Sequence, residues 1–164
     1  AAPNWGDWRD GPGVDAAVRA VLEPAEALLR RRLAAHGRGK GRYGLIHADM
    51  RLANLLIEDG HTRLIDFDDC GFGWFMYDFA AGISFMEEHP QVPALRAAWL
   101  DGYRAVRPLD PEDEDEMDSF IMLRRMALLA WIGSHSATDL ARTQAPHFAA
   151  GTVRLATRYL ARFS

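Results

Sequence analysis

The chain has 164 residues, of which 49% are hydrophobic and 26% are charged, so its composition is that of a globular domain and excludes intrinsic disorder as its main description. No apolar run approaches the roughly 18 residues that a membrane-spanning helix needs, and the net charge of -4 argues against general nucleic-acid binding. The single cysteine, Cys70, excludes an internal disulfide and a multi-cysteine zinc site, and we expect a cytoplasmic protein.

The N-terminal part of the chain is predicted to be an irregular segment followed by a helix. Residues 1–13 combine prolines and glycines with two tryptophans, which is typical of an irregular lead-in. Residues 14–36 place apolar side chains at helical spacing, and Pro24 predicts either a kink or the start of a second helix. Residues 37–44 are rich in glycine and basic residues, and we expect a loop there.

A β-hairpin is the clearest local prediction. Asp59-Gly60 separates two short strands, 54–58 and 62–66, and these two residue types suit the positive φ angles of a tight hairpin turn. Residues 71–77 contain two glycines and four aromatic side chains, and we expect another loop.

The rest of the chain is predicted to be helical, so the expected fold class is mostly α with a short β-hairpin. Asp78 is a candidate N-cap for a helix that ends near residue 88. The next helix is expected to begin at Pro93, because proline is favoured in the first turn. Further along we expect an acidic loop or helix start over 108–118, a mostly apolar helix over 118–134 and a last helix over 146–163.

A cluster of polar residues around the hairpin is the best candidate for chemistry. Asn54 stands where the first strand begins, and Asp66 stands where the second strand ends. Because an antiparallel pair brings these two ends together, the Asn54 amide and the Asp66 carboxylate should converge, with Asp49 on the loop that leads in. Two oxygen ligands beside a carboxylate suit Mg²⁺, which keeps several waters and takes other ligands from phosphates. A phosphoryl-transfer site needs such ligands and a base that orients the attacking hydroxyl.

The motifs in this segment resemble those of a known family. His-x-Asp-x-x-x-x-Asn at 47–54, followed by Ile-Asp-Phe at 65–67, is similar to the catalytic and metal-binding loops of the protein-kinase-like fold. Residues 66–80 resemble its small-molecule branch, which includes the aminoglycoside phosphotransferases and the choline and homoserine kinases. The resemblance implies the α-helical C-terminal lobe of that fold as a single domain over 14–164, with residues 1–13 near the inter-lobe hinge.

The resemblance also implies a role for each residue of the motif. Asp49 would orient the acceptor hydroxyl or accept its proton, and Asn54 and Asp66 would hold Mg²⁺. His47 would brace the loop rather than react. Arg51 would stabilise charge that develops on the transferred phosphate, although a surface salt bridge explains it equally well.

Nucleotide binding is implied in the same way. Leu56 and Ile65 would form the floor of the adenine pocket for ATP, and Asp78 would be a structural anchor. The kinase-like fold also has an N-terminal lobe with a phosphate-covering glycine loop and a strand lysine. The only lysine here, Lys40, lies in a predicted loop. We therefore expect a C-terminal lobe alone, whose chemistry in isolation is weak or absent.

The expected function is an ATP- and Mg²⁺-dependent transfer of the γ-phosphoryl group to a hydroxyl of a small molecule, such as an aminoglycoside, choline or homoserine. Two alternatives stay open: a protein Ser/Thr kinase of the same branch, and a non-catalytic, pseudokinase-like binding module. A metal-dependent phosphohydrolase would need further ligands, which do not occur at convincing spacing. Neither nucleic acid nor membrane is an expected partner, and self-association through an exposed apolar lobe face is a hypothesis.

Two charged runs also need an explanation. The basic residues between 30 and 42 are more typical of a solvated helix end than of a nucleic-acid site. The acidic residues between 112 and 118 would either attract a cationic acceptor or form the solvated start of a helix.

Overall fold

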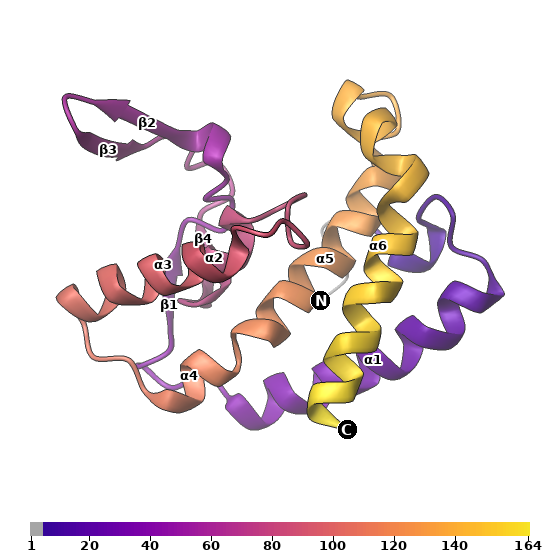
Figure 1. Cartoon of the computed structure of the whole chain (residues 1–164), viewed down its shortest axis with the longest axis horizontal. Coiled ribbons are helices and arrows are strands. Elements are labelled where there is room, and N and C mark those ends of the chain that lie inside the picture. The colour runs from indigo at the N-terminus through magenta and orange to yellow at the C-terminus, as the bar shows by residue number, and fades with distance from the viewer. Residues whose placement is uncertain (1–4) are drawn as a thin grey trace. The chain divides into compact units, whose positions relative to one another are not determined.

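The computed structural model describes residues 5–164, so the first four residues of the predicted irregular segment lie outside the described part. The chain forms two compact units, one made of residues up to 35 together with 122–164, the other of residues 36–121. Both contain helices, and the second also contains two small antiparallel sheets, so the expected fold class is confirmed (Figure 1).

Among the residues that the structure describes, the first unit contains helices and no strand. Its elements are η1 (Trp8–Asp10), residues 16–35 of α1 (Ala16–His36), residues 122–134 of α5 (Met117–Ser134), and α6 (Asp139–Phe163). Pro24 lies inside α1, so no second helix starts there. A proline removes one backbone hydrogen bond, and the neighbouring Leu22 and Ala25, both fully buried, offset that loss through packing.

The start of α6 differs from the prediction. The helix begins at Asp139 and carries Pro146 in its interior. Its N-cap is Thr138, whose hydroxyl oxygen accepts a hydrogen bond from the backbone N–H of Ala141 at 3.2 Å. The Thr138 hydroxyl thus pairs with a backbone N–H of the first turn that has no partner inside the helix. This cap favours a helix start at Asp139 more strongly than Pro146 favours the start predicted from the sequence.

The second unit contains the predicted hairpin and an additional ribbon. β2 (Leu55–Glu58) pairs with β3 (His61–Leu64) around Asp59 and Gly60, whose φ angles of 49° and 77° confirm the tight turn. β1 (Tyr43–Ile46) pairs with β4 (Gly71–Trp74), although the first two residues of β1 and all of β4 lie in the predicted loops 37–44 and 71–77.

Glycines explain why the second ribbon forms. An added Cβ at Gly73 would overlap the Ile46 side chain, and one at Gly44 would come within 3.0 Å of the Phe75 ring. The missing side chains therefore let neighbouring residues pack directly on one face of the ribbon. Leu45 and Phe72 form a cross-strand pair on the other face and are 68% and 77% exposed.

Four helical segments complete the second unit. They are η2 (Leu52–Asn54), α2 (Tyr77–Gly82), α3 (Val92–Val106) and α4 (Pro111–Asp115), followed by the first turn of α5. The predicted helix over 78–88 is wrong in two respects: α2 ends at Gly82, and Asp78 is not its N-cap. Asp78 lies inside α2 and is buried, because its carboxylate is used elsewhere in the unit.

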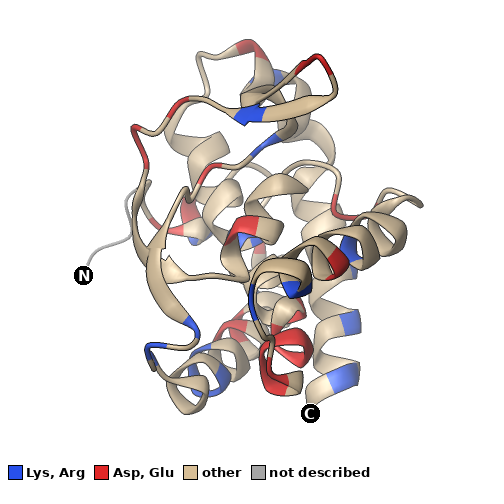
Figure 2. Ribbon diagram, turned by 90° about the vertical axis from the view of Figure 1, so that its left-hand side faces the viewer, with Lys and Arg blue, Asp and Glu red and all other residues tan. Residues whose placement is uncertain are grey.

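Arginines of the same unit form ion pairs with residues of the acidic run, and Figure 2 shows where acidic and basic residues lie along the ribbon. Arg96 contacts Asp118 at 2.8 Å, and Arg104 pairs with Glu114. Asp113 contacts Arg42 at 3.2 Å. The acidic side chains therefore connect α4 to its surroundings and are not simply a solvated helix start.

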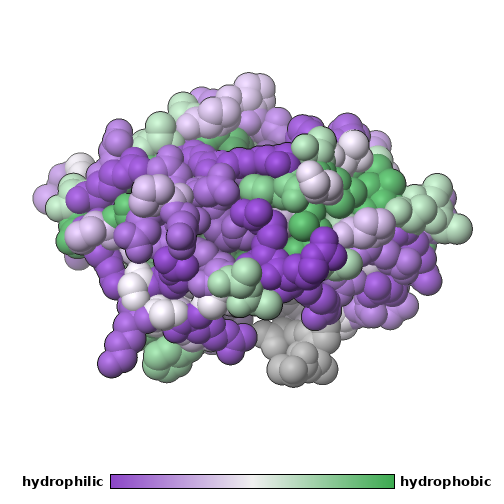
Figure 3. Space-filling model, turned by 90° about the horizontal axis from the view of Figure 1, so that it is seen from below, coloured by the Kyte–Doolittle hydropathy of each residue, from purple (hydrophilic) through white to green (hydrophobic). Residues whose placement is uncertain are grey.

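The surface shown in Figure 3 is predominantly hydrophilic, with a smaller hydrophobic area. Over residues 5–164, every helix is either too short or too polar to cross a lipid bilayer.

Candidate functional site

The candidate site is built on two loops of the second unit. Residues 47–54 follow β1, and residues 65–70 connect β3 to β4. Asp78 anchors the first loop: its two carboxylate oxygens accept hydrogen bonds from the backbone N–H groups of His47 at 3.0 Å and Ala48 at 2.8 Å. Ala48 has a φ of 65°, which is uncommon for a residue with a Cβ. The Asp78 carboxylate therefore stabilises a backbone conformation that the loop alone would disfavour.

His47 connects the two loops. Its Nδ1 lies 3.3 Å from the backbone N–H of Asp49 and accepts a hydrogen bond from it. The ring proton of a neutral imidazole is then on Nε2, which lies 3.0 Å from the carbonyl oxygen of Ile65 and donates to it. The His47 side chain is buried and packs on the Phe67 ring, with 4.8 Å between centroids. These contacts hold the two loops together.

Asp49, Arg51 and Asn54 form a single hydrogen-bonded group. The Asn54 side-chain nitrogen donates to the Asp49 carbonyl at 2.8 Å and to the Asp49 carboxylate at 3.1 Å. Arg51 Nε donates to the same carboxylate oxygen at 3.0 Å. Because both partners of the Asn54 nitrogen are acceptors, the orientation of the amide is fixed. Asp49 and Asn54 are only 8% and 5% exposed.

Asp66 is connected to this group through the backbone. The backbone N–H of Ile65 donates to the Asn54 carbonyl at 3.1 Å, so Asp66 directly follows a residue that is bonded to Asn54. Asp66 is exposed and has a φ of 63°. Over residues 5–164, its carboxylate has no side-chain hydrogen bond or ion pair.

The two predicted metal ligands are chemically suited to Mg²⁺. A carboxylate and an amide oxygen are hard donors, and a cation that prefers waters and phosphates needs few protein ligands. Within the described part of the chain, no three or more His, Cys, Asp or Glu side chains gather in a way that could hold a metal ion.

The predicted adenine-floor residues lie on the hairpin. Leu56 is on β2 and Ile65 follows β3, and they are 48% and 40% exposed. Figure 1 shows the hairpin extending away from the rest of its unit. These apolar side chains are thus accessible at the edge of the two loops.

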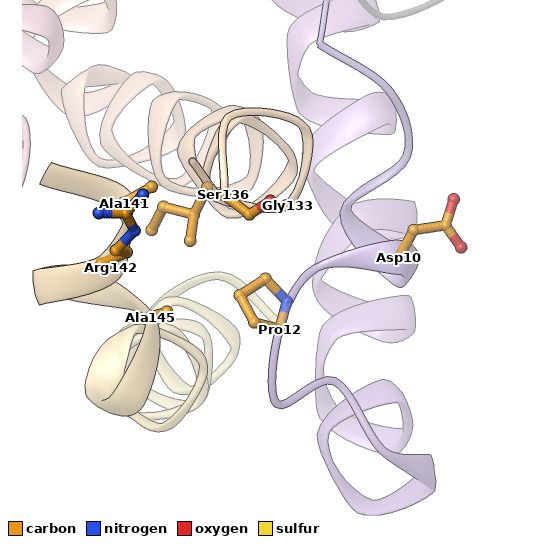
Figure 4. A pocket seen from close by; sticks show the side chains of 8 residues that line it. Asp10, Pro12, Gly133, Ser136, Ala141, Arg142 and Ala145 are labelled. Atoms are coloured by element: carbon orange, nitrogen blue, oxygen red, sulfur yellow. The ribbon is translucent and has the colours of Figure 1, made fainter. Parts of the chain in front are cut away.

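The first unit contains a cavity of about 270 Å³ that none of the predicted site residues lines. Arg142 at its edge donates to the Ala137 carbonyl at 2.6 Å and to Asp139 at 3.3 Å, and the Asp10 carboxylate points away from the cavity (Figure 4). The lining residues are Asp10, Pro12, Ile132, Gly133, Ser136, Ala141, Arg142 and Ala145.

Two features of the second unit were missed by the sequence patterns. The β1–β4 ribbon orders the approach to both loops, and its signal was the alternation of glycine with aromatic residues at 71–74. The contact of His36 with Asp113, at 3.2 Å, joins residues far apart in sequence and had no local signal.

The chain is similar to known kinases. The model of the phosphotransferase enzyme family matches residues 3–119. A microcompartment-associated aminopropanol kinase of known structure has 48% sequence identity and a TM-score of 0.90, and the match covers 98% of this chain and 50% of that chain. Amicoumacin kinase from Bacillus subtilis (strain 168) is 28% identical over 131 residues, which are 73% of this chain and 38% of the relative.

A third similar protein shows the shared fold. The structure of amicoumacin kinase hAmiN, in complex with AMP-PNP, Ca²⁺ and Ami, matches with a TM-score of 0.66 at 24% identity, over 85% of this chain and 46% of that one. The chain therefore spans about half the length of the solved structures that it matches. The family match covers more than half of the present chain, and the chain belongs to the phosphotransferase enzyme family.

Proposed function

We propose that this chain carries the hydroxyl-activating and magnesium-binding residues of an ATP-dependent small-molecule kinase. The observation that carries the proposal is the connection between the two motif loops: Asn54 bonds to Asp49, and His47 bonds to Ile65, the residue before Asp66. Phosphoryl transfer needs metal ligands next to a base that orients the acceptor. In a member of the phosphotransferase enzyme family, this combination supports transfer of the γ-phosphoryl group to a hydroxyl.

Asp49 is the proposed base. Arg51 and Asn54 both donate to the same oxygen of its carboxylate, which fixes the orientation of the group before an acceptor arrives. An acceptor hydroxyl bound to this carboxylate gives its proton to Asp49 as its oxygen bonds to the γ-phosphorus of ATP, and the bond from that phosphorus to the β-phosphate oxygen breaks to release ADP. Arg51 is partly exposed, so its guanidinium can also face the negative charge of the transferred group.

Asn54 and Asp66 are the proposed ligands of Mg²⁺. The fixed amide of Asn54 presents its oxygen, and the exposed carboxylate of Asp66 supplies the negative charge. When bound, Mg²⁺ would neutralise part of the phosphate charge of ATP. Leu56 and Ile65 would offer an apolar surface to the adenine ring. The use of ATP fits the cytoplasmic setting that the sequence predicts.

The acceptor class that we propose is a small amino alcohol. The support is the 48% identity, over 98% of this chain, with an aminopropanol kinase. A protein acceptor has no comparable support.

Calorimetric titration of Mg·ATP into the chain tests the metal site. We expect the wild-type chain to bind and Asp66→Asn to lose the binding at least tenfold. Asp101→Asn is the matched control, because Asp101 is an exposed aspartate on α3, and it should keep wild-type affinity. Equal affinity of Asp66→Asn and wild type would contradict the metal role, and no binding by any variant would favour the non-catalytic binding module.

Release of ADP tests the transfer itself. Aminopropanol and homoserine serve as acceptors, and propylamine, which lacks a hydroxyl, measures background hydrolysis. In a protein where an N-terminal lobe completes the nucleotide site, we expect acceptor-dependent ADP release that falls by roughly 10²–10⁴ in Asp49→Asn, the range for loss of a general base. Unchanged release in this variant would exclude Asp49 as the base.

A further inference from the structure

A largely buried cluster of titratable and charged side chains lies at the base of the β1–β4 ribbon, where Tyr43 pairs with Trp74, at the opposite end from the two site loops. His36 ends α1, Arg42 directly precedes β1, and Asp113 lies on α4. The side chains of His36 and Asp113 are only 5% and 7% exposed. One oxygen of Asp113, Oδ1, lies 3.2 Å from both His36 Nε2 and Arg42 Nε.

The contacts indicate which nitrogen of His36 carries the proton. Arg42 Nη1 lies 3.4 Å from His36 Nδ1 and also donates to the His36 carbonyl at 3.0 Å. Arginine has no acceptor, so Nδ1 faces a donor and is the nitrogen without a proton, whereas Nε2–H faces the Asp113 carboxylate. A second proton would therefore have to enter Nδ1, directly opposite the guanidinium of Arg42.

The surroundings oppose that second proton. Burial, followed by the positive charge of Arg42, holds the pKa of His36 below its ordinary value, although Asp113, Glu116 and Glu112 act in the opposite direction. Burial also raises the pKa of Asp113, whose Oδ1 has no well-aligned hydrogen bond to any residue that the structure describes. The three side chains line a small void, which Tyr103 of α3 also lines, together with Trp74, Phe75 and Phe120.

The cluster is connected to the ribbon through the backbone. The N–H of Phe75, just after β4, donates to the Arg42 carbonyl at 3.0 Å. The indole N–H of Trp74 donates to the Gly37 carbonyl at 2.6 Å. The segment between His36 and Arg42 thus holds the end of the ribbon, and loosening this segment removes both hydrogen bonds.

We propose that His36, Arg42 and Asp113 form an acid-sensitive latch at the base of the ribbon. Uptake of a proton from solvent at His36 Nδ1 replaces an acceptor by a donor in front of Arg42, so the contact breaks and residues 37–42 open together with residues 71–75. This inference concerns local opening of the backbone and does not depend on the proposed kinase activity.

The direction of the pH effect follows from linkage. The pKa of His36 is lower in the folded chain than in the unfolded one, so the unfolded or opened state binds the proton more readily. The latch is therefore fully stable above the unperturbed histidine pKa of about 6.5 and weakens as the pH falls below it. One proton increases the opening constant by at most about tenfold per pH unit.

Hydrogen exchange measured between pH 7.5 and pH 5, corrected for intrinsic exchange rates, tests the latch. In the wild type we expect protection of residues 37–42 and 71–75 to decrease below about pH 6.5. In His36→Gln, whose amide is neutral at every pH, that decrease should be absent. His147→Gln is the matched control, because His147 is an exposed histidine of α6, and it should behave like the wild type.

Asp113→Asn provides a second test that does not depend on how His36→Gln folds. Loss of the carboxylate charge makes protonation of His36 harder, so the onset of opening should move to lower pH, in step with the NMR titration of the His36 ring. A purely structural role for Asp113 would change protection equally at all pH values and would overturn the proposal. The same pH dependence in His36→Gln as in the wild type would also overturn it.

Discussion

The loops that carry Asp49 and Asp66 differ in how far the protein itself holds them. Asp49 is buried and bonded to Arg51 and Asn54, and its loop is tied by Asp78. Asp66 has a φ of 63°, similar to the 65° of Ala48 in the first loop, but its side chain is exposed. This difference indicates that the fold orders the first loop before any ligand binds, whereas the second loop presents its carboxylate to solvent. Substitutions on each side should therefore have very different effects on stability.

The largest expected loss is at the anchor of the buried loop. Asp78→Asn keeps the size of the side chain but replaces one acceptor oxygen by an NH₂ group facing a buried backbone N–H. We expect the free energy of unfolding to fall by about 3 kcal/mol, the range for a lost hydrogen bond to a buried charged group. Urea denaturation measures it, and Asp101→Asn, on the exposed surface of α3, should change stability by less than about 0.5 kcal/mol. A similar small loss in both variants would show that the loop does not depend on Asp78.

The next effect concerns the ribbon that supports both loops. Gly73→Ala places a Cβ against the Ile46 side chain, and overpacking of this kind costs about 2 kcal/mol. Gly71→Ala is the matched control, because the nearest atom to its added Cβ is 3.9 Å away, and it should be close to neutral. Ile46→Val removes the Cδ1 atom and should recover part of the loss in the Gly73→Ala background. Thermal unfolding of the four proteins gives the comparison, and the absence of any recovery would contradict the packing explanation.

A smaller effect is expected in the hairpin. Gly60 has a φ of 77°, and among residues 5–164 nothing beyond its chain neighbours comes within 4 Å of an added Cβ, so Gly60→Ala should cost about 1 kcal/mol through backbone strain alone. Gly102→Ala should change stability in the opposite direction. An added Cβ at Gly102 likewise meets no described residue outside its own helix backbone, and Gly102 lies inside α3, where alanine stabilises a helix by up to about 1 kcal/mol. Denaturant midpoints of both variants test whether the backbone conformation of the glycine, rather than contacts of the added Cβ, decides if stability rises or falls.

The smallest effect on stability is expected at Asp66, in the exposed loop. Asp66→Asn should change the free energy of unfolding by less than about 0.5 kcal/mol, because the side chain is exposed and asparagine tolerates the left-handed backbone. Urea denaturation in the absence of metal is the measurement. A loss close to that of Asp78→Asn would mean that the Asp66 loop is also held by the protein.

Local signals predicted a large part of this molecule. The hairpin followed from Asp59-Gly60, and the convergence of its ends followed from antiparallel pairing. The motif spacing between His47, Asn54 and Asp66 predicted the family, which the comparisons confirm. The roles of these residues in catalysis stay predictions. These successes share a cause, because each depends on residues that are close in sequence or joined by one short turn.

The helical class, the hairpin and the identity of the candidate site residues were thus predictable from local patterns. Tertiary packing decided that residues 71–74 form a strand, because a two-stranded ribbon is stable there only once Gly73 accepts the Ile46 side chain. It also decided that the Asp78 carboxylate holds His47 and Ala48 rather than capping a helix. A buried polar group goes to the donors that the fold brings to it, and local sequence does not contain that information.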